Sequence, residues 1–190
     1  PALLLGEQML GGGFLSSRLA TRVRREEGLS YSIWAQISAG SLDESGAFLA
    51  GAIFAPENAA RLEAAVREEL QRALADGFTE QEVASAKSGY LQSVRVARSS
   101  DTRLAAALAS NQFLGRTYAF QEALDAKVAA TTPQQVVEAL RRRLDLSKLT
   151  TVIAGDFAGA AKRPGSLRTQ SGGSTAAAGP APASKPAAAP

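Results

Sequence analysis

The sequence changes its hydrophobic period early in the chain, and the resulting order of patterns limits the fold more than any other feature. Over residues 31–38 apolar and polar side chains largely alternate, a period of two that is typical of a β-strand. Residues 39–45 are rich in turn-forming side chains, and residues 46–55 are an apolar run that indicates a second, buried strand. Together these segments predict an antiparallel hairpin.

Helical patterns lie on both sides of this hairpin. Residues 2–10 and 15–27 predict two short helices, the second of them ended by Gly28 at the position of a C-terminal cap. After the hairpin, apolar residues recur every fourth position between residues 57 and 76. Further helices are predicted over residues 79–97, 101–114, 119–128 and 132–144, and a last strand over residues 148–154. We therefore expect an α+β fold in which an antiparallel or mixed sheet carries helices packed on one face.

Two of the predicted helices begin with clear start signals. Thr79 followed by Glu82 forms the pattern of a capping box, in which each side chain satisfies a backbone N–H at the helix start. Thr132 precedes Pro133, an N-cap followed by proline at the first helical position. These signals fix where the helices after the hairpin begin.

Composition divides the chain into a folded body and a tail. Residues 1–158 carry the periodic patterns, whereas residues 171–190 contain only Ser, Gly, Thr, Ala, Pro and Lys. We expect residues 159–190 to be a disordered tail, because such a segment buries too little apolar surface to offset its ordering entropy. The tail contributes +4 to the formal charge of +3, so the body is close to neutral. A neutral body gives no basic face for nucleic acid, and we expect no nucleic-acid partner.

The sequence also excludes several classes of chemistry. It contains no histidine and no cysteine, so it cannot form a histidine-based triad, a thiol nucleophile, a disulfide or a zinc motif of the HExxH or HxxEH type. We therefore expect no metal ligand and no cofactor site in this chain. No apolar run reaches the ~20 residues that a transmembrane helix needs, so no transmembrane segment is predicted.

Arg24 and Tyr31 are the pair of residues that suggests a site. Arg24 falls in the last turn of the predicted second helix, and Tyr31 begins the first strand after the turn at Gly28. A sharp reversal between them would bring both tips to one cleft, where a permanent cation and a neutral hydroxyl donor suit a peptide carbonyl or a developing oxyanion. Spacing alone does not decide this, because the helix dipole favours arginine at a helix end and packing favours tyrosine in a strand.

Two motifs around this pair carry a family resemblance. The run Leu10-Gly11-Gly12-Gly13-Phe14-Leu15-Ser16-Ser17-Arg18-Leu19, followed by Val23-Arg24-Arg25-Glu26-Glu27-Gly28-Leu29-Ser30-Tyr31-Ser32, resembles the C-terminal type of domain in zinc peptidases of the pitrilysin/insulinase family. Residues 77–82, 132–136 and 151–156 resemble later elements of the same domain, so the match covers about residues 2–158. The domain's opening strand, expected ahead of residue 2, is missing, and we interpret the chain as truncated at its N-terminus.

The resemblance implies a division of labour between two halves. In this family one half carries an inverted HxxEH zinc motif, and the other encloses the substrate and presents an Arg/Tyr pair toward the metal. Arg24 and Tyr31 match that pair in type and spacing. The resemblance therefore implies that they bind the backbone of a peptide or unfolded protein and stabilise the tetrahedral intermediate. Zinc and the glutamate base would belong to a homologous domain or subunit.

Two other interpretations remain open at the level of sequence. Some members of the family are scaffolds without activity, so this chain could be a non-catalytic assembly subunit of the same fold. A generic α+β binding module would leave the motifs as coincidence. An HxxEH motif in the same or a neighbouring reading frame would favour the peptidase, and its absence would favour the assembly subunit.

Overall fold

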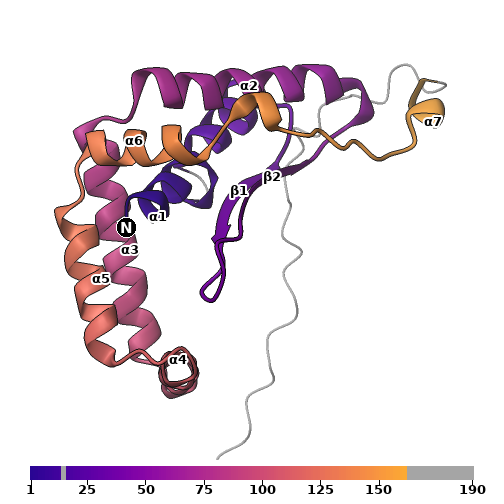
Figure 1. Ribbon diagram of the computed structural model, residues 1–190. Coiled ribbons are helices and arrows are strands. Elements are labelled where there is room, and N and C mark those ends of the chain that lie inside the picture. Colours follow the sequence, from indigo (N-terminus) through magenta and orange to yellow (C-terminus); the bar gives the residue numbers. More distant parts are fainter. Residues whose placement is uncertain (14–15, 162–190) are drawn as a thin grey trace, which may run out of the picture.

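The computed structural model describes residues 1–13 and 16–161, which form a hairpin and a series of helices (Figure 1). The elements begin with α1 Ala2–Glu7, η1 Gln8–Gly12, η2 Ala20–Glu26, β1 Ser32–Ala39 and β2 Gly46–Ile53. They continue with η3 Pro56–Asn58, α2 Ala59–Asp76, α3 Glu80–Arg98, α4 Asp101–Phe113, α5 Tyr118–Ala130, α6 Pro133–Arg143, η4 Leu146–Lys148 and α7 Phe157–Ala161. The predicted α+β fold class, the hairpin and the helices after it are confirmed.

The hairpin has one covered face and one open face. β1 and β2 pair antiparallel, with Ala35 opposite Ala50 and Trp34 opposite Gly51. Ala35 is buried against Gly11, where an added Cβ would lie 2.3 Å from the Ala35 nitrogen, so only glycine permits this close approach. Trp34 points to the other face and is 45% exposed. Helices therefore cover one face of the sheet, as the sequence predicts.

The two N-terminal helices are wider than ordinary α-helices where they end. η1 continues α1 as a π-helical stretch, and η2 is π-helical throughout its seven residues. Such turns are rare and often lie near functional sites. The sequence predicts helices at both places, but nothing in its periodicity indicates the π geometry.

The long helices form a framework around the hairpin. In Figure 1, α2 crosses the top of the molecule, α6 runs below it, and α3 and α5 descend side by side to α4 at the bottom. Both predicted helix starts are confirmed. Thr79 forms a capping box with Glu82 at the start of α3, and Thr132 forms one with Gln135 at the start of α6. Gly77 ends α2 with a φ of 74°, a conformation that favours glycine.

Two clusters of buried apolar residues form the core. The larger joins α1 and η1 to α2, α3, α5 and α6, and contains Leu5, Leu10, Leu70, Val83, Val128, Val136 and Leu140. The smaller cluster contains Val23, Leu29, Leu62 and Ala65. It packs η2 and the start of the hairpin against α2, and it therefore supports the backbone of the candidate site.

The predicted last strand over residues 148–154 is wrong for this structure. Among the described residues the sheet consists of β1 and β2, and residues 149–154 follow η4 without regular secondary structure. No neighbouring strand in the described part of the chain offers them a backbone ladder. Thr151 is held instead by side chains of α2, with its hydroxyl donating to Glu63 at 2.9 Å and accepting from Arg67 at 2.9 Å.

The predicted tail lies almost wholly outside the described residues. The short helix α7 spans the expected boundary between residues 158 and 159, and the disorder expected for residues 162–190 concerns residues that the structure does not describe. Within residues 1–13 and 16–161, no helix combines the length and apolar character needed to cross a bilayer.

Candidate functional site

Arg24 and Tyr31 lie together in the structure. Arg24 belongs to η2, and Tyr31 directly precedes β1. Gly28 reverses the chain between them with a φ of 63°, and the Leu29 N–H donates to the carbonyl oxygen of Val23 at 2.9 Å across this turn. The guanidinium carbon of Arg24 lies 3.8 Å from the centre of the Tyr31 ring. The predicted reversal thus stacks the cation on the aromatic face.

The residues next to this pair are buried and hold it in place. Val23 and Leu29 pack in the smaller core cluster against α2. The Ser30 hydroxyl donates to the carbonyl oxygen of Ile53 at 2.7 Å and accepts from the Ser32 N–H at 3.1 Å. These contacts tie the start of β1 to the end of β2. The backbone of the candidate site is therefore fixed, while the side chains of Arg24 and Tyr31 face outward.

The polar groups of the pair have no partner within the described residues. Among these residues Arg24 makes a cation–aromatic contact with the Tyr31 ring but no hydrogen bond or ion pair. The Tyr31 hydroxyl makes no hydrogen bond to any described residue. Tyr31 is 75% exposed and Arg24 is partly buried. Stacking uses the flat face of the guanidinium and leaves the N–H donors at its edge free. The arrangement can donate several hydrogen bonds to one acceptor.

A second arginine on the same segment has the opposite character. Arg18 Nε donates to Glu82 Oε1 at 2.7 Å, and one Arg18 Nη donates to the carbonyl oxygen of Gly77 at 2.8 Å. This bond to Arg18 is the main reason that the pKa of Glu82 falls to about 2. Arg18 also lies over the Phe78 ring. The network joins the N-terminal segment to the start of α3.

Buried Glu69 completes this network and is a residue that the sequence analysis missed. Glu69 is 4% exposed and lies 3.9 Å from Arg18 and 3.3 Å from Arg72, and burial raises the pKa of its carboxyl. A readable signal existed, because Glu69 follows Ala65 and precedes Ala73 by four residues on the apolar side of α2.

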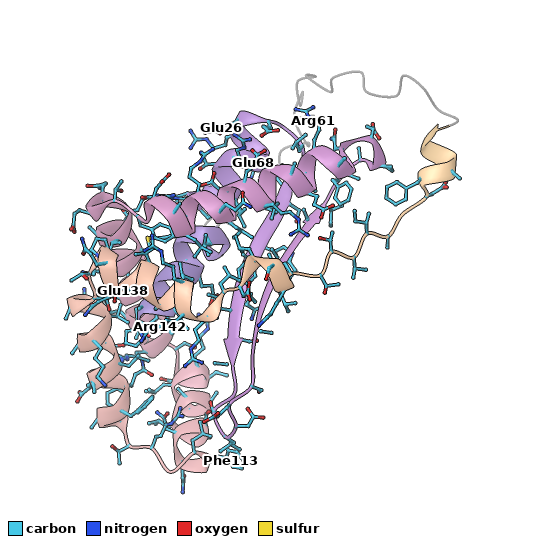
Figure 2. The ribbon with its side chains drawn as sticks, turned by 45° about the horizontal axis from the view of Figure 1, so that its top comes forward. Glu26, Arg61, Glu68, Phe113, Glu138 and Arg142 are labelled. Atoms are coloured by element: carbon cyan, nitrogen blue, oxygen red, sulfur yellow. The ribbon has the colours of Figure 1, made fainter. Side chains whose placement is uncertain are left out.

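Further ion pairs join η2 to α2 at the edge of this network. Arg22 pairs with Glu68 at 2.9 Å, and Arg61 pairs with Glu27 at 3.5 Å. Figure 2 shows Glu68 and Arg61 along α2 with Glu26 close by on η2. Because the two arginines pair with Glu68 and Glu27, this region is a structural contact between α2 and the C-terminal part of η2.

The residues of this chain do not fit a zinc ion. The sequence has neither histidine nor cysteine, and the part that the structure describes contains no cluster of three or more potential metal ligands. Structural and hydrolytic zinc sites are built from three or four such groups. Any zinc chemistry associated with this chain must therefore use ligands from elsewhere.

Comparisons with known proteins show which family this chain resembles. Residues 1–90 match the model of a family described as the peptidase M16 inactive domain. A search of curated proteins found no match. The matched residues are a little under half of the chain, and the match confirms the predicted resemblance to the metal-free domain of pitrilysin/insulinase peptidases.

Solved structures share the fold. The crystal structure of a peptidase M16 inactive domain from Pseudomonas fluorescens has a TM-score of 0.70 at 24% identity, covering 77% of this chain and 34% of that chain. A conserved protein from Enterococcus faecalis V583 has a TM-score of 0.62 at 20% identity, covering 74% and 32%. The periplasmic protease PqqL from Escherichia coli has a TM-score of 0.62 at 20% identity, covering 75% and 15%. The chain thus spans between 15% and 34% of the length of these three structures.

Proposed function

We propose that this chain is the substrate-binding half of a bipartite zinc endopeptidase and acts on peptides or unfolded proteins. Arg24 and Tyr31 would hold a carbonyl group of the substrate backbone and stabilise the oxyanion that develops when this carbonyl is attacked. The family match over residues 1–90 supports the placement among such peptidases. The stacked, unpartnered pair supports the role of the two residues.

The observation that carries the proposal is the 3.8 Å stack of Arg24 on Tyr31, with donors unused among the described residues. Free donors on a fixed backbone cost little reorganisation when an anion forms, which is the basis of electrostatic stabilisation in enzymes. The pair would act by donating hydrogen bonds, a role that needs no proton transfer.

The proposal also requires a partner. Since this chain does not fit zinc, the metal would be held by a homologous domain or subunit with the HxxEH motif, where it would supply Lewis-acid activation of water. The chain's own contribution is to bind and orient the substrate backbone and to donate hydrogen bonds.

The test is the turnover of the complex with that zinc-bearing partner after Tyr31→Phe. We expect turnover to fall by about 10²-fold, the size of effect seen for a lost oxyanion donor. Tyr118→Phe is a matched control, because Arg98 lies over the Tyr118 ring at 5.3 Å but pairs with Asp125. Turnover of the control should stay at the level of the unchanged complex.

Unchanged turnover in both variants would reject the role of Tyr31. If no zinc-bearing partner forms a complex with the chain at all, the alternative of a non-catalytic assembly subunit would take its place.

A further inference from the structure

α4 is an apolar helix that buries none of its residues. From Leu104 to Ala109 it consists of leucine and alanine alone, and no charged side chain follows Arg103 before the helix ends at Phe113. The long helices α2, α3, α5 and α6 each bury at least one residue. An apolar helix side is normally covered by other parts of a protein. α4 therefore has an apolar side that the described residues do not fill.

A cleft with a volume of about 280 Å³ lies between α4, α3 and the start of α5, where α3 and α5 reach α4 in Figure 1. Ordinary ligand pockets begin at about 300 Å³, so the cleft is of the size that takes a small molecule. Its apolar lining comes from α3 and α4 and consists of Val94, Ala97, Leu104, Ala107 and Leu108.

The charged lining of this cleft is positive. Arg98 and Arg103 lie on either side of the connection between α3 and α4, and both line the cleft, whereas no described aspartate or glutamate does. Arg98 pairs with Asp125, so its charge is balanced. Arg103 is exposed, and its side chain makes no hydrogen bond, ion pair or ring contact with any described residue. One guanidinium with unused donors thus lies at the cleft.

Neutral hydrogen-bonding groups complete the lining. The Tyr90 hydroxyl is half-buried, and burial raises its pKa, so it stays a protonated donor at neutral pH. The Asn111 side chain also lines the cleft and makes no hydrogen bond to a described residue. The cleft therefore combines an apolar surface with donors and one unpaired positive charge.

We propose that this cleft binds a small amphipathic monocarboxylate, whose carboxylate accepts hydrogen bonds from Arg103 and whose hydrocarbon part packs between α3 and α4. The forked donors of arginine match the two oxygens of a carboxylate. The volume of the cleft restricts the ligand to a short hydrocarbon part. A free fatty acid and the apolar C-terminal residue of a peptide share this chemistry. The inference does not depend on Arg24 and Tyr31.

The first test is a calorimetric titration of the chain with octanoate. We expect one molecule to bind per chain with a Kd of about 1 mM, the affinity of a ten-atom ligand at modest energy per atom. Octylamine has a similar hydrocarbon chain with a positive charge, and acetate has the carboxylate without the chain. Both should bind at least about tenfold more weakly than octanoate.

Arg103→Gln and Arg95→Gln separate recognition by the cleft from a general effect of charge. Both arginines are exposed and their side chains have no partner among the described residues, but Arg95 on α3 is absent from the lining. Arg103→Gln should raise the Kd for octanoate about tenfold, the effect of a lost hydrogen bond to a charged group. Arg95→Gln should leave it unchanged.

Ala107→Trp and Ala105→Trp test the apolar part of the cleft. Both alanines are exposed on α4, but Ala107 lines the cleft and Ala105 does not. Ala107→Trp should fill the cleft and abolish octanoate binding, whereas Ala105→Trp should keep it. Thermal melting followed by circular dichroism checks that both variants are folded.

A last arm distinguishes the two sources of the carboxylate. Acetyl-leucyl-leucine is titrated with a free C-terminus and as its C-terminal amide. Tighter binding of the free acid than of octanoate, with no binding of the amide, would identify a peptide C-terminus as the ligand. Tighter binding of octanoate would identify a free fatty acid.

Three results would overturn the proposal. Octylamine binding as tightly as octanoate would mean that the cleft does not recognise a carboxylate. An equal Kd for Arg103→Gln and Arg95→Gln, or retained binding in Ala107→Trp, would place the ligand elsewhere. Failure of both octanoate and the free peptide acid to bind would remove the site.

Discussion

Arg18 and Arg24 lie on the same short segment and each stacks on an aromatic ring, but only one of them is fully engaged. Arg18 combines its contact with Phe78 with bonds to Glu82 and to the Gly77 carbonyl. Within the described residues Arg24 stacks on the Tyr31 ring and makes no hydrogen bond or ion pair. The motif therefore contains one arginine that is engaged within the fold and one whose N–H donors have no hydrogen-bond acceptor among the described residues.

The largest expected effect of this difference is on stability. Arg18→Ala should lower the free energy of unfolding by about 2–3 kcal/mol, because it leaves Glu69 and the Gly77 carbonyl short of a partner. Arg24→Ala should cost less than about 1 kcal/mol, the range of an exposed cation–aromatic contact. Urea denaturation of both variants measures the two losses. Equal losses would remove the distinction between the two arginines.

A smaller effect is expected in the pH dependence of stability. The pKa of Glu82 is lowered to about 2, so its stabilising contribution is present above the ordinary value near 4.5 and is lost as the pH falls toward 2. Glu82→Gln should remove this acid-sensitive part, which we put at about 1–2 kcal/mol because the side chain is partly exposed to solvent.

The pH effect is measured as the melting temperature between pH 2 and pH 6. Burial raises the pKa of Glu69, so its contribution has the opposite sign and decreases as the pH rises above about 4.5. Glu44→Gln, a change on the exposed hairpin turn, should keep the acid-sensitive slope of the unchanged chain. If Glu82→Gln shows the same dependence of melting temperature on pH as the unchanged chain, the bond from Arg18 does not stabilise the Glu82 carboxylate.

Much of the fold could be predicted because it depends on local signals. The alternation in β1, the capping boxes at Thr79 and Thr132, and the glycine after η2 each act within a few residues, and the structure confirms them. The convergence of Arg24 and Tyr31 could be predicted for the same reason, since one reversal at Gly28 places both. Their role in binding a substrate stays a prediction.

What the sequence did not show depends on contacts over long distances. The strand predicted over residues 148–154 requires a neighbour, and in the described residues none is hydrogen-bonded to it. In the sequence Glu69 is one more charged residue of α2. Its partner Arg18 lies more than 50 residues earlier in the chain, so their contact depends on the fold. The π-helical geometry of η2 is likewise not indicated by the periodicity of its residues.

In the proposed function Arg24 would donate to the oxyanion of a bound substrate, while Arg18 supports the fold. The most direct measurement is the affinity of the complex with its zinc-bearing partner for a peptide analogue in which a tetrahedral phosphonate replaces the scissile carbonyl. We expect Arg24→Ala to weaken this affinity by about 10²-fold, in proportion to its loss of kcat/KM, while the exposed neighbour Arg25→Ala changes neither. An unchanged affinity in Arg24→Ala would rule out the proposed role of Arg24.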